Sequence, residues 1–400
     1  KMTTTINNEH NKHNVPNLRF PEFQGEWKKT TIGDIADLYK GTGISKDQLS
    51  DDGEPCILYG ELYTKYKSET IREVISKTNI DNTKLVRSKA NDVIIPCSGE
   101  TAEDIATARC VLNGNILLGG DLNIIRLHGY DGAFMSYQLN GRRKYDIAKV
   151  AQGVSVVHLY GEHLKGVKTI NPCLEEQKKI AKLLSLLDER IATQNKIIED
   201  LKKLKSAIIE IEYTPNTKTT SHIGNVIEQI SKRNKNNAIQ NVLSVSNRQG
   251  FIKQSDQFEN RNVASEDTSN YKIVEKNDFA FNPARINVGS IARLTTFENG
   301  IVSPMYICFR TQENVAPEYI DFFFESKHFY CEIQKRLEGS VRQCLSFEGL
   351  CNIPFSLPSL EMQQRIGKRL FTLGQKIKTE TDLLELLNKQ KQYLLRQMFI

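Results

Sequence analysis

The chain has 400 residues, of which 39% are hydrophobic and 26% are charged. This length is too great for a single small domain and supplies apolar side chains for two or three cores. Its 54 basic and 48 acidic residues give a net charge of +6, a mild excess that allows a polyanionic partner but does not require one. No apolar run approaches the roughly 20 residues of a membrane-spanning helix, so a membrane-spanning protein is not expected.

The first seventeen residues are rich in Asn, Thr and His and lack the apolar core of a signal peptide, so we expect residues 1–17 to be disordered. The eight cysteines form no Cys-x-x-Cys pair, and no histidine lies at metal-ligand spacing from them. Scattered thiols of this kind are typical of a reducing compartment. We therefore expect a cytoplasmic protein without a metal site.

Two parts of the sequence match each other at a separation of 186 residues. The pattern Pro-x-Leu-Glu-x-Gln begins at Pro172 and again at Pro358. Near the start of each half, Ile32-Gly33 is repeated as Ile223-Gly224, with a few inserted residues between the copies. Self-similarity over this distance indicates an internal duplication.

Each copy of the pattern opens a long stretch with helical periodicity. Alternating steps of four and three residues meet mainly apolar side chains, which is the pattern of a coiled-coil seam. The predicted seam positions are Ile180, Leu184, Leu187, Ile191, Gln194, Ile198 and Leu201 in the first stretch and Ile366, Leu370, Leu373, Ile377, Glu380, Leu384 and Leu387 in the second. Gly367 and Gly374 interrupt the second stretch, and we expect them to soften its first turns.

We therefore predict spacer helices over residues 173–213 and 358–400. Such a helix would be roughly 55 Å long at 1.5 Å per residue. If the two helices pair antiparallel about their midpoints, Gln194 and Glu380 would meet at the centre and fix the register. The alternative is that each apolar stripe packs into the core of an ordinary helical domain.

The segments between these helices have another character. Residues 18–172 and 214–357 contain short β-branched runs separated by Gly, Asn and Asp turns. The predicted fold is α/β, with two mixed, β-rich globular domains joined by two long antiparallel coiled-coil helices in a pseudo-twofold repeat.

Sequence patterns of catalysis are incomplete throughout the chain. Gly41-Thr-Gly43 lacks the third glycine or the lysine of a phosphate-binding loop. His158 and His163 have no neighbouring Cys, Asp or Ser pattern, and Asn282-Pro-Ala lacks the second proline and the aromatic residue of an amino-methyltransferase loop. We predict no catalytic, cofactor-binding or metal-binding residue, and the pattern favours a reader or adaptor over an enzyme.

Several further motifs are informative as an ordered set. They occupy residues 18–23, 32–35, 40–43, 59–62, 152–155 and 278–289. Together with the two Pro-x-Leu-Glu-x-Gln helix starts, they resemble the specificity subunit of type I restriction-modification systems over residues 15–400.

This resemblance implies that each globular domain is a target-recognition domain that reads one half of a double-stranded DNA site. Because the two halves of the chain differ in sequence, the implied site is bipartite and asymmetric. The resemblance also implies two modification subunits, which use S-adenosylmethionine to methylate adenine at N6, and restriction subunits that use ATP and Mg²⁺. The chain itself would carry no cofactor.

Candidate DNA-reading side chains lie in loops that carry basic, amide and hydroxyl groups, because these groups pair with base edges or phosphates. In the first domain they are Tyr59, Glu61, Tyr63, Lys65, Ser98, Thr101 and Ser155. In the second domain they are Asn247, Arg248, Gln249, Arg285, Asn287, Arg342 and Gln343. Arg285 and Asn287 are the strongest of these candidates.

Two other functional classes remain open at this point. A self-contained DNA methyltransferase or nuclease with two recognition domains would require a cofactor fold for which the chain shows no fingerprint. A purely structural coiled-coil scaffold would bind randomised duplexes without sequence preference.

Overall fold

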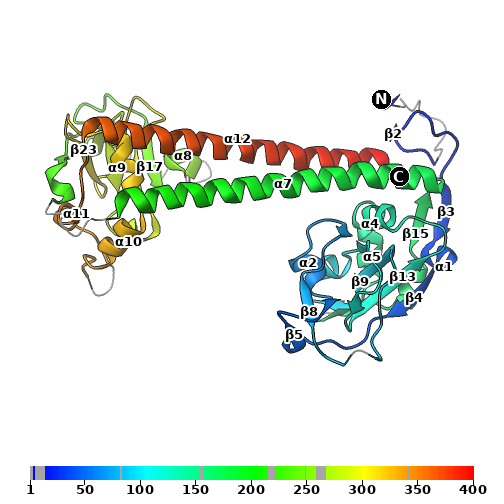
Figure 1. Ribbon diagram of the computed structural model, residues 1–400. Coiled ribbons are helices and arrows are strands. Elements are labelled where there is room, and N and C mark those ends of the chain that lie inside the picture. Colours follow the sequence, from blue (N-terminus) through cyan, green and yellow to red (C-terminus); the bar gives the residue numbers. More distant parts are fainter. Residues whose placement is uncertain are drawn as a thin grey trace. The chain divides into compact units, whose positions relative to one another are not determined.

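The computed structural model describes residues 3–4, 14–81, 83–153, 156–214, 221–247, 249–257, 267–339 and 343–400. Most of the segment predicted to be disordered, residues 1–2 and 5–13, lies outside the described residues. The chain divides into two units, which we call the first unit (Lys1–Asn195 with Asp382–Ile400) and the second unit (Lys196–Thr381). Each unit contains a globular domain and part of the two long helices, α7 (Leu174–Tyr213) and α12 (Leu360–Met398) (Figure 1).

The first unit is built on small sheets with short helices around them. Its sheets have the strand orders β4–β13–β9–β11–β7 and β12–β6–β8–β5, and the pairs β1–β2, β10–β14 and β15–β3 complete them. The strands are β1 (Thr3–Thr4), β2 (Leu18–Arg19), β3 (Lys28–Thr31), β4 (Ala36–Lys40), β5 (Leu49–Ser50), β6 (Glu54–Ile57), β7 (Thr70–Ile71), β8 (Ser76–Thr78), β9 (Asp92–Pro96), β10 (Ser98–Gly99), β11 (Arg109–Val111), β12 (Leu117–Leu118), β13 (Leu122–Leu127), β14 (Val157–His158) and β15 (Lys168–Asn171). The short helices are α1 (Ile32–Ile35), η1 (Lys46–Gln48), α2 (Glu61–Thr64), α3 (Ala102–Ile105), α4 (Gly132–Asn140), α5 (Lys144–Val150) and α6 (Gly161–Lys165).

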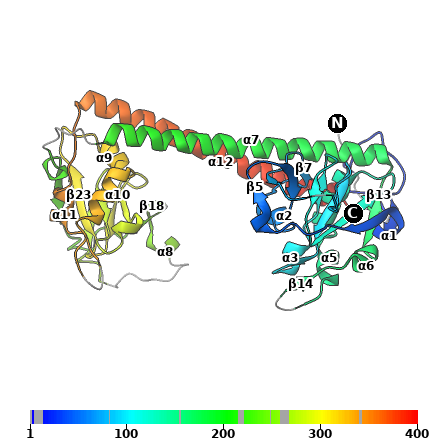
Figure 2. The ribbon, with the colours of Figure 1, turned by 60° about the horizontal axis from the view of Figure 1, so that its bottom comes forward.

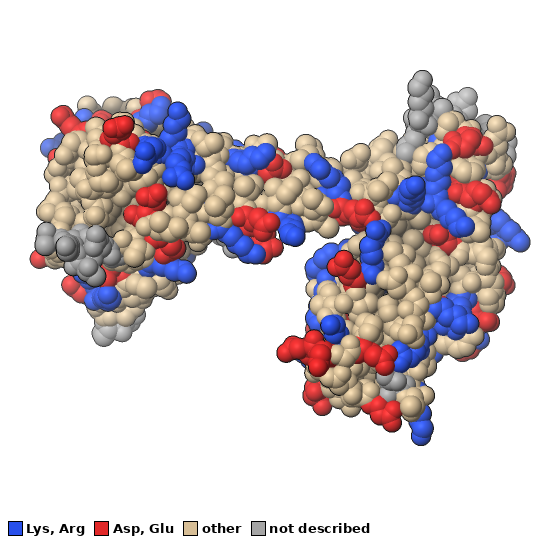
Figure 3. Space-filling view, viewed as in Figure 1, with Lys and Arg blue, Asp and Glu red and all other residues tan. Residues whose placement is uncertain are grey.

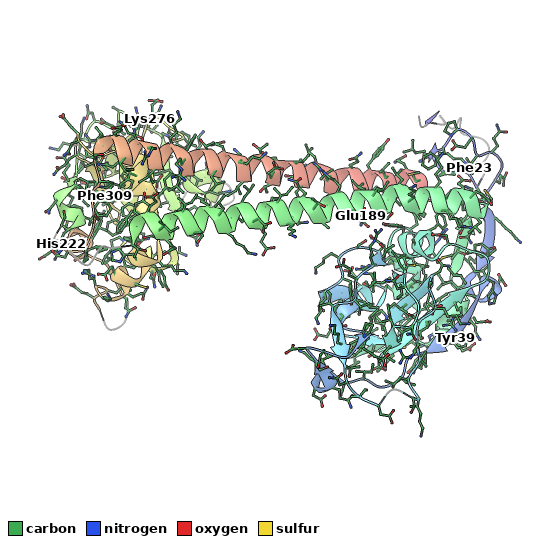
Figure 4. The ribbon with its side chains drawn as sticks, viewed as in Figure 1. Phe23, Tyr39, Glu189, His222, Lys276 and Phe309 are labelled. Carbon is green, nitrogen blue, oxygen red and sulfur yellow. The ribbon has the colours of Figure 1, made fainter. Side chains whose placement is uncertain are left out.

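The second unit repeats this plan with other side chains. Its sheets have the strand orders β16–β23–β20–β21 and β18–β17–β22–β19. The strands are β16 (Ile227–Ile230), β17 (Val242–Ser246), β18 (Gly250–Lys253), β19 (Lys272–Glu275), β20 (Phe279–Phe281), β21 (Ile291–Arg293), β22 (Asn299–Val302) and β23 (Ile307–Thr311). The short helices are η2 (Ile223–Asn225), α8 (Gln254–Gln257), η3 (Ile286–Val288), α9 (Pro317–Phe323), α10 (Lys327–Gln334) and α11 (Phe347–Cys351). Phe309, labelled in Figure 4, is fully buried in a core rich in phenylalanine.

An aspartate at the start of one strand shows that the duplication is structural. Asp92 accepts hydrogen bonds from the Lys89 backbone N–H at 2.7 Å and from the Arg126 guanidinium at 2.8 and 2.9 Å. Asp278 accepts them from the Glu275 backbone N–H at 2.7 Å and from Arg310 at 3.0 Å. Asp92 is the first residue of β9 and Asp278 immediately precedes β20, and each arginine lies on a neighbouring strand, β13 or β23. The same charge-assisted hydrogen bonds therefore hold the beginnings of β9 and β20 in place.

The glutamine of each Pro-x-Leu-Glu-x-Gln pattern connects a long helix to its domain. The Gln177 amide donates to the Pro172 carbonyl at 2.9 Å and accepts from the Asp131 backbone N–H at 2.9 Å. The Gln363 amide likewise donates to the Pro358 carbonyl at 2.9 Å and accepts from the Ala316 backbone N–H at 2.9 Å. Asp131 and Ala316 are the N-cap residues of α4 and α9. One buried amide thus fixes the starts of two helices in each unit.

The seam residues predicted from the heptad pattern occupy the less exposed face of α7 and α12, and every one of them is buried or half-buried. In the first unit, Ile180 and Leu184 share a core with Leu394. In the second unit, Ile209 shares a core with Ile366 and Leu370. The predicted pairing of Gln194 with Glu380 would join the two units, and it stays a prediction.

Two lysines attach the ends of the long helices. They are Lys205 and Lys391, which lie one step beyond Leu201 and Leu387 along the two apolar stripes. The Lys391 ammonium of α12 lies 2.6 Å from the Glu69 carboxylate and 2.7 Å from the Asp188 carboxylate in the first unit. Burial by itself lowers the pKa of Lys391, but the two carboxylates outweigh this effect and raise it. In the second unit, Lys205 of α7 lies 2.6 Å from Glu325. The two lysines therefore attach the ends of the long helices to the domains, and Lys391 also joins α12 to α7 through Asp188.

The helix α12 continues without a break through Gly367 and Gly374, and the expected softening of its first turns stays a prediction. Gly367 has a packing reason. A Cβ atom there would come within 2.6 Å of the Glu318 side chain on α9, so glycine allows the two helices to approach closely. Gly374 has open space around it.

Within the described residues, none of the helices combines the length and apolar composition needed to span a membrane.

We expect Gln363→Ala to lower the free energy of unfolding by about 1–3 kcal/mol, because it leaves the buried Ala316 N–H without an acceptor. Gln364→Ala is the matched control, since Gln364 is exposed and its loss should cost less than about 0.5 kcal/mol. Urea unfolding of both variants measures the difference. Equal midpoints for the two variants would contradict the role assigned to Gln363.

We expect Lys391→Ala to lower the free energy of unfolding by about 3–5 kcal/mol, because Glu69 and Asp188 would remain buried without the ammonium that contacts both of them. Lys389→Ala removes an exposed lysine that pairs with Glu385 on the helix surface, and it should cost less than about 1 kcal/mol. Thermal unfolding followed by circular dichroism separates the two cases. A Lys391→Ala variant as stable as the Lys389→Ala variant would rule out the anchoring role.

Candidate nucleic-acid interface

A groove of about 840 Å³ lies beyond the end of strand β6 in the first unit. Segments that are far apart in the sequence form it: the loop and turn around η1, the residues that follow β6, and the two residues before β13. Three predicted DNA-reading residues line this groove, namely Tyr59, Glu61 and Lys65. Its walls also include the apolar side chains of Ile44 and Leu58.

Glu61 is buried, and other residues of the first unit occupy its carboxylate. One oxygen, Oε1, accepts from the Lys65 ammonium at 2.6 Å and from the Ser76 hydroxyl. The other oxygen, Oε2, accepts from the Leu58 backbone N–H at 3.0 Å. These contacts hold α2 against β8 and fix the direction in which Lys65 leaves the helix.

The remaining first-domain candidates lie outside the groove lining. Tyr63 is half-buried, and burial, together with the nearby Tyr59 and Asp104, raises the pKa of its hydroxyl. The Thr101 hydroxyl accepts from the Asp104 backbone N–H at 3.1 Å and so caps α3. Ser98 lies in β10, which pairs with β14 beside α3 (Figure 2). Ser155 lies outside the described residues.

The second unit has a groove of about 590 Å³ beside strand β17. Two predicted residues, Asn247 and Arg285, line it together. Gln249, Asn287 and Gln343 are not part of its lining. Arg248 and Arg342 lie outside the described residues.

The turn that presents Arg285 is held by backbone hydrogen bonds. Its N–H donates to the Asn282 carbonyl at 3.0 Å, and its carbonyl accepts from the Ser290 N–H at 3.1 Å. Gly289 closes the turn with φ = +88°, a conformation that side chains other than glycine disfavour. Within the described part of the chain, the exposed Arg285 guanidinium makes no hydrogen bond or ion pair with another residue. A rigid backbone thus presents a free planar cation to the groove.

A concentration of positive charge does not distinguish either groove from the rest of the surface. On the face shown in Figure 3, Lys and Arg are interspersed with Asp and Glu over each unit. Sequence reasoning missed Lys46 and Asp121 in the first groove and Gln254 and Met305 in the second. No local signal separates them from other loop residues, because each reaches its groove only through the folding of distant segments.

Comparison with known proteins identifies the family. The type I restriction modification DNA specificity domain matches residues 24–203 and again residues 208–389. The chain belongs to this family of DNA specificity subunits. The two matches also agree with the predicted duplication.

Relatives of this specificity subunit match it over almost its whole length. The type I restriction enzyme MjaVIII specificity subunit of Methanocaldococcus jannaschii is 25% identical, over 96% of this chain and 92% of its own. The crystal structure of the S subunit from M. genitalium has a TM-score of 0.63 at 18% identity and covers 96% of this chain and 99% of its own. A chain from a study of complex assembly and conformational transition of the type I R-M system has a TM-score of 0.50 at 14% identity, covering 93% and 97%.

These findings confirm the predicted fold class and the resemblance. The specificity subunit is a DNA-recognition component with two recognition domains, and it is not the catalytic component of its system. A self-contained methyltransferase or nuclease and a purely structural scaffold are therefore both disfavoured.

We expect Glu61→Ala to lower the free energy of unfolding by about 1–3 kcal/mol, because the Leu58 N–H and the Lys65 ammonium lose their acceptor. Glu73→Ala, at an exposed position, is the control and should change it by less than about 0.5 kcal/mol. Urea unfolding gives the stabilities, and binding to randomised duplexes gives the sequence preference. A changed preference at unchanged stability would make Glu61 a reading residue.

Proposed function

We propose that this specificity subunit reads an asymmetric bipartite site in double-stranded DNA. The domain of residues 18–172 would read one half-site and the domain of residues 214–357 the other. Residues 173–213 and 358–400 would act as spacers that set the gap between the half-sites. The observation that carries this proposal is the duplication itself: the same aspartate–arginine and glutamine contacts recur in both units, while the loop side chains differ.

The DNA-reading residues stay a proposal, and their surroundings divide them into two groups. Arg285, Asn247 and Tyr59 line grooves and are suited to direct contact. Glu61 and Thr101 are occupied by contacts within the chain, and they are suited to positioning their neighbours. Lys65 combines both features, since its ammonium is bonded while its side chain is exposed.

We further propose that two modification subunits and the restriction subunits assemble on this chain. The long helices carry exposed apolar side chains, which a docked subunit would cover if they form a contiguous patch. They are Leu186, Leu386 and Tyr393 in the first unit and Leu204, Ile211, Leu360 and Phe371 in the second. S-adenosylmethionine would bind to the modification subunits, and ATP and Mg²⁺ to the restriction subunits.

The proposed compartment is the cytoplasm. All eight cysteines lie within the described residues, and all of them are free thiols. Burial raises the pKa of Cys56 and of Cys97 to about 11, which keeps these thiols protonated and unreactive. Free cysteines that form no disulfide are typical of a reducing environment.

Methylation mapping tests the proposal directly. The chain is co-expressed with its modification subunit, and N6-methyladenine is located in the host DNA by long-read sequencing. We expect methylation within a bipartite asymmetric motif with a fixed gap, and its loss when the modification subunit is expressed alone. A continuous palindromic motif, or the same motif without this chain, would contradict the proposal.

A further inference from the structure

The two grooves occupy equivalent places in the duplicated fold. In the first unit, β12 runs parallel to β6, with Leu117 opposite Cys56 and Leu118 opposite Ile57. In the second unit, β22 runs parallel to β17, with Ile301 opposite Val242 and Val302 opposite Leu243. The β6–β12 pair and the β17–β22 pair therefore have the same parallel arrangement, which aligns the residues of one pair with those of the other. Cys56 and Ile57 correspond to Val242 and Leu243.

The residues that follow these paired positions form the grooves. Residues 58–61 line the first groove, and their counterparts, residues 244–247, line the second. In the turn that follows the adjoining strand, Asp121 of the first groove corresponds to Met305 of the second. The two grooves therefore share these corresponding segments, and each adds a segment of its own: residues 43–49 in the first groove and residues 282–290 in the second.

The second groove has the chemistry of a surface that reads base edges. Its described lining consists of hydroxyl, amide, aromatic and apolar side chains and one guanidinium, with no carboxylate. Asn247 and Gln254 supply amides that both donate and accept, and the exposed Met305 can contact a thymine methyl group. Arg285 adds a fork of donors that matches the O6 and N7 acceptors of guanine.

The first groove carries its own cation at a different place. Lys46 of η1 is exposed and lines the groove, and no other described residue bonds to its ammonium. The second lysine of this groove, Lys65, is bonded to Glu61 and Ser76. The walls formed by Ile44 and Leu58 make this groove more apolar than its counterpart.

From this correspondence we infer that the two grooves are the duplicated base-reading sites, with Arg285 reading a G·C pair in one half-site and Lys46 contacting bases of the other. The inference rests on the proposed function and narrows it to two surfaces. The side chains of the two grooves differ, and their cations come from different segments, which accounts for an asymmetric recognition sequence. The shared backbone accounts for a common way of approaching the DNA.

The experiment uses the complex with the modification subunit and compares methylation motifs for three kinds of variant. Arg285→Ala should relax discrimination at a G·C position of one half-site by about tenfold or more and leave the other half-site unchanged. Arg285→Lys should keep binding but relax the same position, because lysine retains the charge and loses the fork. Lys46→Ala should relax only the half-site that Arg285→Ala leaves intact.

Matched controls remove a positive charge from the same unit outside the groove lining. The control for Arg285 is Lys276→Ala, at the lysine that is labelled in Figure 4, and the control for Lys46 is Lys77→Ala. Both should leave the motif unchanged. Because Arg285 and Lys46 are exposed and make no contact with another described residue through their charged groups, melting temperatures should match the wild type.

Three outcomes would overturn the inference. An unchanged motif in both groove variants would place base reading elsewhere. A loss that is uniform over all sequences, with a weaker salt dependence of binding, would make these cations phosphate contacts. Relaxation of the same half-site by both variants would contradict one groove per half-site. If the wild-type complex shows no bipartite motif, the proposed function fails, whereas a bipartite wild-type motif with unaltered variants removes only the groove inference.

Discussion

The structure depends on how each long helix is attached to its domain, and a single glutamine does this in both units. Gln177 and Gln363 each join the carbonyl of the preceding proline to the N-terminus of a neighbouring helix. A buried amide in this position must satisfy its donor and its acceptor at once, so it accepts little variation in angle. This constraint fixes the direction in which each helix leaves its domain, on which any spacing between two reading domains would depend.

The lysine anchors act at the opposite ends of the same helices. Lys205 and Lys391 interrupt apolar stripes. Lys205 pairs with Glu325 of the domain at which α7 ends, and Lys391 pairs with Glu69 of the other domain and with Asp188 of α7. A buried ammonium without these partners would be strongly destabilising, so the contacts select one seating of the helix on the domain. Glutamine at the start and lysine near the end therefore define each helix at two points.

The sequence predicted the repeated elements well and the grooves poorly. The helices begin at Leu174 and Leu360, beside the predicted starts, because proline and a heptad stripe are local signals. The sequence did not explain why α12 contains Gly367 despite glycine's low helix propensity, because the reason is close packing against Glu318. Arg285 could be selected from its loop, whereas Lys46 could not, since only the fold brings η1 to the residues beyond β6.

By itself, the sequence determined the duplication, the two long helices with their seam and the family of DNA specificity subunits, because these are carried by periodicity and by motifs that repeat in order. The tertiary structure alone decided what the motifs do. In the folded protein the glutamines hold the starts of the helices and the lysines attach their ends. Within each unit, segments that are distant in the sequence come together to form a groove. Such contacts join residues that are distant along the chain, and the free energy that selects them comes from burial and hydrogen bonding in the folded units.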